Sequence, residues 1–185
     1  MEKLAVLIAT VSLAGTAYAG SFFSESEANN TLATANDLGS YNAANESVLV
    51  SGSLGASDVD WFSFTLDVDA DLAFFSAFGT GDGIMQIVAA GGDVIAFSDD
   101  EGAGAMPALQ IENLAAGTYY VGFSGFSDVF SGSVGSDELA DGLDAAGAGH
   151  GEEFAYKLSV GFSIPAPGAL ALFGMGGIVA TRRRR

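Results

Sequence analysis

Short apolar segments with a two-residue alternation recur along the middle of this chain, separated by clusters of Gly, Asn, Asp and Ser. The run WFSFTL at Trp61–Leu66, for example, places alternate aromatic residues on one face of an extended strand. No helical period of useful length occurs between the two ends of the chain, apart from one helical turn that Leu32–Leu38 could form. About eight strands at near-regular spacing, with tight turns at 67–71 and 91–93, predict an all-β sandwich or barrel. The expected strands are Val48–Leu54, Trp61–Leu66, Leu72–Phe78, Ile84–Ala90, Val94–Ser98, Leu109–Ile111, Thr118–Phe123 and Phe154–Phe162.

The N-terminus has the three parts of a secretory signal peptide. Lys3 supplies the charged region, Leu4–Leu13 is apolar, and Ala17–Ala19 has the small-x-small pattern that signal peptidase accepts. We therefore expect residues 1–19 to be a signal peptide, cleaved after Ala19. The alternative is a buried N-terminal helix.

The C-terminal segment 164–185 is a second candidate for entry into a membrane. A Pro165-Ala-Pro element leads into an uncharged apolar run at 168–180, and four arginines close the chain. Basic residues beside such a run resist translocation and would hold this end on the cytoplasmic side. The run has 13 residues, and a permanent span needs about 20. The pattern favours a transient transmembrane sorting helix, and the alternative is an ordinary membrane anchor.

Residues 20–163 then form one domain, and its charge is extreme. The chain has 23 acidic and 6 basic residues. Without the two ends, 22 acids remain against Lys157 alone, a net charge near −21. Such a body repels nucleic acid and anionic lipid, so we expect no nucleic-acid partner. The absence of cysteine means that an exported domain must be stabilised by its core or by metal ions.

A long loop is expected at 131–153, where the chain is rich in Gly, Ala and acidic residues; such a loop is either functional or disordered. It contains His150, the only histidine of the chain. With no Cys, no Gly-x-Ser-x-Gly elbow, no P-loop and no His cluster, the sequence predicts that the protein is not an enzyme. The number of acidic residues alone does not exclude a pair of carboxylates that could catalyse glycoside hydrolysis.

One set of oxygen-bearing side chains has the chemistry that calcium prefers, which is six to eight oxygen ligands. Four of them lie within six residues, and two more come just before the strand at Trp61. The six candidate metal ligands are Glu25, Glu27, Asn29, Asn30, Asp58 and Asp60. The alternative is that the first four belong to a solvated N-terminal linker.

Two other acidic runs fit calcium less well. Asp67–Asp71 opens like an EF-hand loop, but Leu72 and Phe78 stand where that loop needs Gly and Glu. It is therefore expected to be a turn. Asp99–Glu101 is expected to be a solvated turn, with a weak second cation site as the alternative.

A series of short pieces, in order along the chain, carries a family resemblance. The pieces are Glu25–Asn30, Ala35–Leu38, Val50–Leu54, Asp58–Phe64, Asp71–Leu72, Asp82 with Ile84–Ile87, Gly92–Asp93, Ser98–Asp100, Leu114–Val121 and Tyr156–Val160. The region resembles the bacterial pre-peptidase C-terminal (PPC) domain, also met as the collagen-binding domain of clostridial collagenases. The resemblance implies a jelly-roll-like β-sandwich. It also implies calcium at Glu25, Glu27, Asn29 and Asn30, together with carboxylates before the Asp-x-Phe strand.

The tail at 164–185 resembles the PEP-CTERM sorting signal that an exosortase reads in exopolysaccharide-producing bacteria. Ala166 stands where that signal usually has Glu. The resemblance implies exosortase and signal peptidase as processing enzymes. It also implies a protein held transiently in the inner membrane on its way to the cell surface or extracellular matrix.

These observations predict an exported, non-catalytic surface or matrix protein, a calcium-assisted binding or structural β-sandwich. Its expected partners are extracellular polysaccharide or another surface protein. The alternative is an accessory substrate-binding domain that acts in trans with a secreted hydrolase, since members of the PPC family often follow a protease catalytic domain.

Overall fold

The computed structural model describes residues 19–42, 46–126 and 150–165. Within them the chain forms ten β-strands and one short 3₁₀-helix, η1 (Leu32–Thr34). The strands are β1 (Ala19–Ser24), β2 (Asn36–Tyr41), β3 (Glu46–Leu54), β4 (Val59–Leu66), β5 (Ala70–Gly79), β6 (Gly83–Ala89), β7 (Val94–Ser98), β8 (Ala108–Leu114), β9 (Gly117–Gly125) and β10 (Phe154–Ser163).

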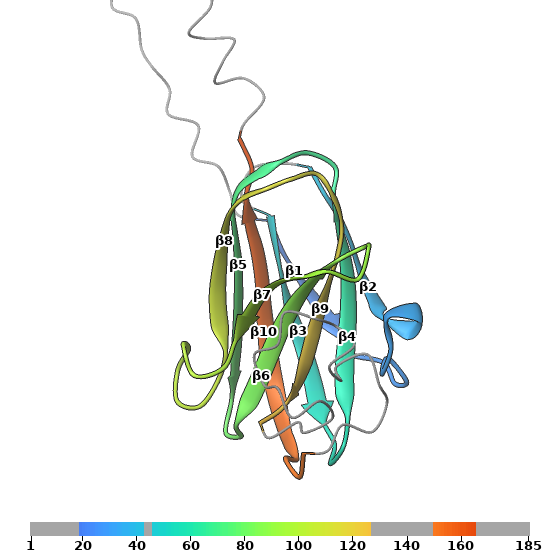
Figure 1. The fold of residues 1–185 in the computed structure, drawn as a ribbon, viewed down its shortest axis with the longest axis vertical. Helices are drawn as coiled ribbons and strands as arrows, with labels where there is room; N and C mark the ends of the chain where they lie inside the picture. The colour runs from blue at the N-terminus through green and yellow to red at the C-terminus, as the bar shows by residue number, and fades with distance from the viewer. Residues whose placement is uncertain (1–18, 43–45, 127–149, 166–185) are drawn as a thin grey trace, which may run out of the picture.

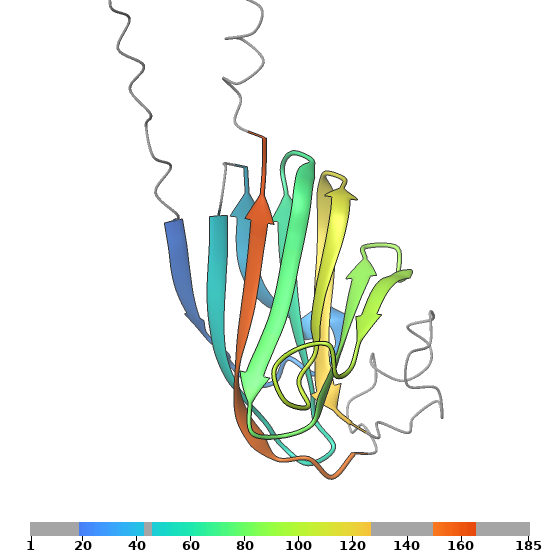
Figure 2. The same ribbon diagram turned by 90° about the vertical axis from the view of Figure 1, so that its left-hand side faces the viewer.

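The strands form two five-stranded sheets that pack face to face (Figure 1). Sheet A has the order β1-β3-β10-β5-β8, and Figure 2 shows these strands side by side. Sheet B has the order β2-β4-β9-β6-β7. β1 pairs in parallel with β3 and β2 in parallel with β4, whereas the other pairs are antiparallel. The all-β sandwich predicted from the sequence is therefore confirmed.

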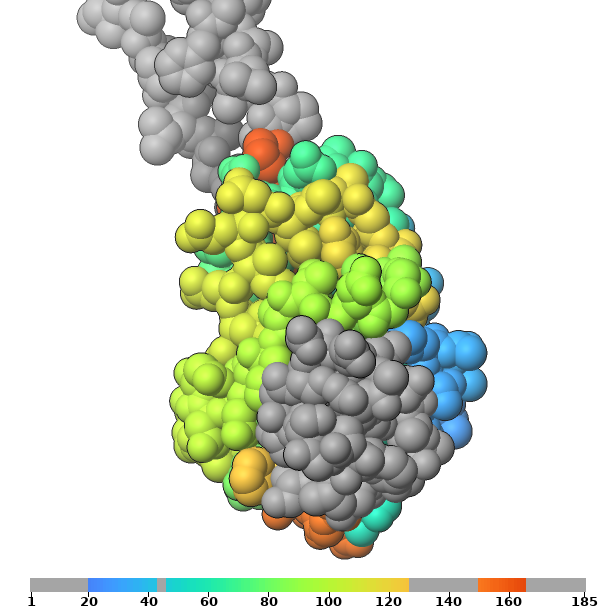
Figure 3. Space-filling model, in the orientation of Figure 1, coloured from blue at the N-terminus to red at the C-terminus, as the bar shows by residue number. Residues whose placement is uncertain are grey.

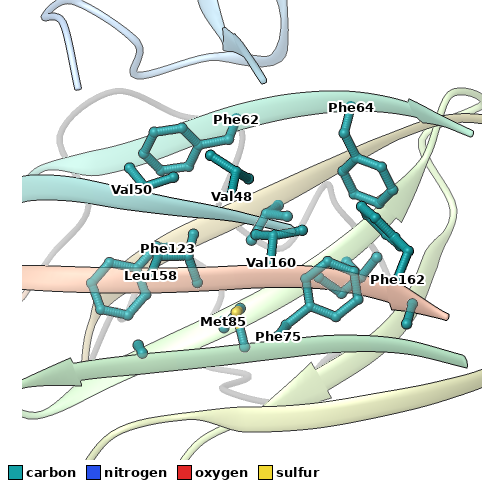
Figure 4. Close-up of a cluster of buried hydrophobic side chains, with 14 of the residues drawn as sticks. Val48, Val50, Phe62, Phe64, Phe75, Met85, Phe123, Leu158, Val160 and Phe162 are labelled. Atoms are coloured by element: carbon teal, nitrogen blue, oxygen red, sulfur yellow. The ribbon is translucent and has the colours of Figure 1, made fainter. Parts of the chain in front are cut away.

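The core lies between the two sheets and follows directly from the alternation in the sequence. Strand β10 shows it most clearly, because every second residue from Phe154 to Phe162 is a buried aromatic or aliphatic one and the residues between them are exposed or half-buried. Figure 4 shows side chains of both sheets meeting in this core, with Phe64 near Phe162. Burial of so many aromatic and β-branched side chains is the main stabilising contribution in a chain without disulfides.

A smaller apolar cluster covers part of the outer face of sheet B. Trp61 points away from the main core and is completely buried. Leu32 and Ala35, from the segment around η1, pack against this cluster. That segment projects from the side of the sandwich as the blue bulge beside β4 (Figures 1 and 3). It is therefore fixed to the sandwich next to the start of β4.

All eight strands expected from the sequence are present, but their number was underestimated by two. The missed strands, β1 and β2, are both edge strands that pair in parallel. Strand β2 has a shift in its pairing between Asp37 and Ser40, with Gly39 at a φ of 93°, so it lacks a clean alternation. The expected helical turn within Leu32–Leu38 is the three-residue η1, followed directly by β2.

Both ends of the described chain leave from the same end of sheet A. In the strand register, Ala19 of β1 and Phe162 of β10 both pair with Glu46 of β3. The signal peptide, most of the sorting tail and most of the 131–153 loop lie outside the described residues, so the predicted division into 1–19, 20–163 and 164–185 stays a prediction. Within the described ranges, no helix is long and apolar enough to cross a bilayer.

Candidate metal centre

A cluster of carboxylates lies at the opposite end of the sandwich from the two chain ends. Glu25 follows β1, Asp60 is the second residue of β4, and Glu27 belongs to the segment between β1 and η1. One oxygen of each of the three side chains lies within 4.8 Å of the other two. Residues 33 or more positions apart in the sequence thus meet because β1 and β4 belong to different sheets that face each other here.

Asp60 is the most unusual member of the cluster because it is fully buried. Its Oδ2 accepts a hydrogen bond of 2.8 Å from the Tyr156 hydroxyl, and its Oδ1 has no hydrogen-bond partner within the described structure. Burial, followed by the proximity of the Glu25 carboxylate, raises the pKa of Asp60 to about 10, and the Tyr156 hydrogen bond opposes that rise. A carboxyl in this environment either keeps a proton or needs a cation beside it.

Glu25 is held by backbone and side-chain donors from sheet A. Its backbone N–H donates to the carbonyl of Ser51 (3.0 Å), and its Oε2 accepts a hydrogen bond of 2.8 Å from the Ser53 N–H. Its Oε1 accepts the Tyr156 hydroxyl at 3.3 Å. Tyr156 therefore contacts both Glu25 and Asp60, and its own pKa is raised well above the usual value by burial and by these two carboxylates.

Asn29 joins this cluster to β4. The side chain is fully buried, and its backbone carbonyl accepts a 2.9 Å hydrogen bond from the Trp61 N–H. Its Nδ2 donates to Glu25 Oε1 at 3.3 Å, whereas its Oδ1 has no hydrogen-bond partner in the part of the chain described. The segment is thus fixed to the sandwich at Glu25 and at Asn29, with residues 26–28 exposed between them, and this contradicts the alternative of a solvated linker.

Of the remaining predicted ligands, Glu27 belongs to the cluster, whereas Asn30 and Asp58 form a pair beside it. The side chain of Glu27 is exposed, and its pKa is raised by partial burial and by the charges of Asp58 and Glu25. Asn30 donates a hydrogen bond through Nδ2 to Asp58 Oδ1. Asp58 also accepts the N–H groups of Gly55 (3.2 Å) and Val59 (3.0 Å), which fixes the turn before β4. Asn30 and Asp58 therefore lie beside the three-carboxylate group and outside it.

Two residues of this site were not found from the sequence. The sequence pattern places Tyr156 only in the last strand, and the one signal for a further role is that a tyrosine on the core face of a strand needs a hydrogen-bond partner for its hydroxyl. Gly52 is the other, because a Cβ at this position would collide with the Tyr156 ring and the Glu25 carboxylate. Glycine at 52 therefore lets both side chains reach the cluster.

The donor set suits a hard divalent cation. It offers carboxylate oxygens from Glu25, Glu27 and Asp60, and calcium prefers such oxygen ligands. Asn29, whose Nδ2 contacts Glu25, has a buried amide oxygen that could add a further ligand. Asp60 and Asn29 each have a buried oxygen without a hydrogen-bond partner in the described structure, and a bound cation would satisfy both atoms. These residues fit calcium on chemistry and burial.

A second acidic group lies at the same end of the molecule. Asp82, Asp99 and Asp100 each place one oxygen within 4.8 Å of the others. Burial and the charge of Asp100 raise the pKa of both Asp82 and Asp99. Ser98 donates a 2.7 Å hydrogen bond to Glu101, which lowers the pKa of Glu101. The residues of this group are half-buried or exposed, unlike Asp60, although Asp82 Oδ1 and Asp99 Oδ1 are also buried oxygens without a hydrogen-bond partner in the described structure.

His150 has a structural environment. The side chain is 3% exposed, its Nδ1 accepts the Glu152 N–H at 3.2 Å, and its Nε2 donates to the Asp58 carbonyl at 2.7 Å. Both ring nitrogens are therefore occupied by backbone groups. The imidazole ties the start of the last segment to the turn before β4.

The sequence matches no protein-family model and no curated protein. Among solved structures, the fold is similar to the pre-peptidase C-terminal domain of collagenase from Bacillus anthracis, with a TM-score of 0.45 and 16% identity over 68% of this chain and 93% of that chain. It is also similar to PliG, a periplasmic inhibitor of g-type lysozyme from Aeromonas hydrophila, with a TM-score of 0.43 and 14% identity over 80% of this chain and 100% of that one. Both similarities are distant, so the function is argued from the residues.

Proposed function

We propose that this protein is an exported, non-catalytic β-sandwich that binds calcium at Glu25, Glu27, Asn29 and Asp60, and that it acts as a binding or structural module outside the cell. The observation that carries the proposal is the Asp60 carboxyl, which is fully buried with one oxygen unpartnered and lies within 4.8 Å of two further carboxylates. Asn30 and Asp58 support the site from the side by fixing the turn before β4.

The expected role of the cation is to tie the two sheets together. Glu25 is attached to sheet A through the Ser51 and Ser53 backbone, and Asp60 belongs to sheet B. A cation between them displaces the proton of the buried Asp60 carboxyl and attracts the carboxylates of both sheets, at a site where the chain has no disulfide to join them. Calcium in the millimolar range, as outside cells, suits extracellular modules of this kind.

The export part of the proposal rests on the sequence of the two ends. In this reading signal peptidase cleaves after Ala19, an exosortase-type enzyme reads the tail at 164–185, and the domain reaches the cell surface or matrix. This sequence of export steps is supported by the position of the two chain ends, which leave the domain at the same end of sheet A. The metal centre lies at the other end and stays clear of the membrane while the tail is inserted. Extracellular polysaccharide or a surface protein is the proposed partner.

The metal part of the proposal is tested by thermal unfolding of the full chain in a mild non-ionic detergent. With a dissociation constant near 0.1 mM, about 10 mM calcium stabilises the folded state by roughly 2.7 kcal/mol, which for a domain of this size raises the melting temperature by several degrees. Equal melting temperatures in calcium and in chelator would exclude the site. Immobilised polysaccharides of different charge, probed with the calcium-loaded chain, then test the proposed partner.

A further inference from the structure

The outer face of sheet A is unusual for so acidic a protein, because it carries almost no charge. The outward residues of β3, β10, β5 and β8 largely alternate with the buried ones, and the exposed charged residues of these strands are Lys157, Glu112 and Asp71 at the start of β5. No other described segment crosses this face in Figure 2. Two copies of a protein with a net charge of −17 repel each other, and this face is where that repulsion is weakest.

The face has a ridge and a trough on neighbouring strands. The β5 ridge consists of Leu72, Phe74 and Phe78, and the two phenylalanines are 40% and 47% exposed. The β10 trough consists of Ser159, Gly161 and Ser163, and it forms the floor of a groove of about 360 Å³. Leu72 and Phe74 line this groove on one side, and Glu46 and Ser47 line it on the other. Leu72 and Phe74 therefore stand directly beside small residues, whereas Phe78 stands beside Lys157 and is separated from Phe74 by Ser76.

The strand register makes this arrangement self-complementary. Phe74 pairs with Gly161, Leu72 with Ser163, and Phe78 with Lys157. Consider a two-fold axis parallel to the strands and midway between β5 and β10. It would place the ridge of each copy over the trough of the other copy, with paired residues at the same position along the strand direction. The Phe74 ring would then face Gly161 of the second copy, and the Phe78 ring would face its Lys157, a favourable cation–π contact.

We infer that two copies of this protein associate face to face through sheet A, with Phe74 of each copy inserted over Gly161 of the other. Two twisted sheets stack in this way at an angle of about 30°, with their side chains interdigitated. The isologous contact is closed, so it gives a dimer and no fibre.

The expected affinity follows from the size of the face. Four strands spaced about 4.8 Å apart, over the roughly 20 Å from Leu72 to Phe78, cover on the order of 380 Å² of flat area per copy. Even with the relief of the side chains, this lies at the low end of specific interfaces, which bury about 800 Å² per partner. A dimer with a micromolar dissociation constant is therefore expected.

Sedimentation equilibrium of the full chain in density-matched detergent, over about 1 to 300 µM, measures this association. The tail is present in every variant, so association through the tail contributes equally to all of them. Phe74→Ala removes the ridge side chain and should weaken the dimer by at least about tenfold. Ile95→Ala is the matched control, because Ile95 is 41% exposed on β7 of the other sheet, and it should leave the dimer unchanged.

Filling the trough gives a second, independent variant. A Cβ at Gly161 would meet only ordinary contacts, the nearest being the Ser47 side chain at 3.5 Å, so Gly161→Phe has room for its Cβ and directs its ring away from the core. Replacing glycine within a strand by an aromatic residue should keep or raise the melting temperature. The same change should abolish the dimer, and the double variant Gly161→Phe/Phe74→Ala, which moves the ring from one strand to the other, should restore it.

A monomer across the whole concentration range overturns the inference. So does a dimer that neither Phe74→Ala nor Gly161→Phe weakens, which would place the contact on another surface or on the tail. Failure of the double variant to restore association would refute the ridge-over-trough pairing.

Discussion

The buried carboxyl of Asp60 makes a specific prediction about pH. The pKa of this group is near 3.8 in the unfolded chain and about 10 in the folded one. At neutral pH the folded state therefore holds a proton that the unfolded state has lost. The stability associated with this group is fully present below pH 3.8 and is lost as the pH rises toward 10. Between pH 3.8 and pH 7 the loss is on the order of 4 kcal/mol at 1.36 kcal/mol per unit.

The substitution Asp60→Asn removes this titration while preserving the shape of the side chain and an acceptor for Tyr156. In chelator, the variant should match the wild type near pH 4 and melt roughly 10 °C higher than it at pH 7. In calcium the difference in melting temperature between the variant and the wild type should become smaller or change sign. Only the wild type keeps the Asp60 carboxylate as a ligand and is stabilised by the cation.

The assay is thermal unfolding of the full chain, followed by circular dichroism from pH 4 to pH 8 in chelator and in 10 mM calcium. Asp82→Asn is the matched control, since it neutralises an acid of the second cluster at the same end of the molecule. A variant Asp60→Asn that is destabilised equally at every pH, or that still gains stability with calcium, would refute the reasoning. Loss of the calcium effect in Asp82→Asn alone would move the site to the second cluster.

Two further substitutions test how the site is held. Gly52→Ala should displace Tyr156, destabilise the fold by about 1–3 kcal/mol through overpacking and remove the calcium effect. Gly161→Ala on the same sheet is the control and should cause none of these changes. Equal melting curves for the two variants would contradict the close approach at Gly52. His150→Ala should lower the unfolding free energy by about 1–3 kcal/mol, because the Asp58 carbonyl and the Glu152 amide lose their hydrogen-bond partner. Unfolding by denaturant measures this change. An unchanged midpoint would contradict the structural role of His150.

The sandwich could be predicted from the sequence because its antiparallel strands alternate cleanly. Strand β10, which lies at the centre of sheet A, shows the pattern over its whole length. Strands β1 and β2 escaped detection for a physical reason. Each is an edge strand of six residues held mainly by backbone pairing to one neighbour, so its side chains need not alternate.

The sequence indicates which residue types form the candidate site, but it does not show how these residues are arranged in space. The oxygen-rich segment from Glu25 to Asn30 and the acids before β4 are visible in the sequence, yet their burial is not. Asp60 is buried because Phe62 and Phe64 fix the face that β4 turns inward, and Tyr156 reaches it from a strand 96 residues away. Such long-range pairing across two sheets depends on topology, which local patterns do not specify.

The most direct test of the central claim is isothermal titration of the full chain with calcium at pH 7, in two buffers that differ in ionisation heat. Calcium must displace the proton of Asp60, so binding should release about one proton per bound ion. The account predicts a single saturable site, a heat that differs between the two buffers, and no saturable binding by Asp60→Asn. Absence of binding up to millimolar calcium, or binding that is the same in Asp60→Asn and releases no proton, would contradict it.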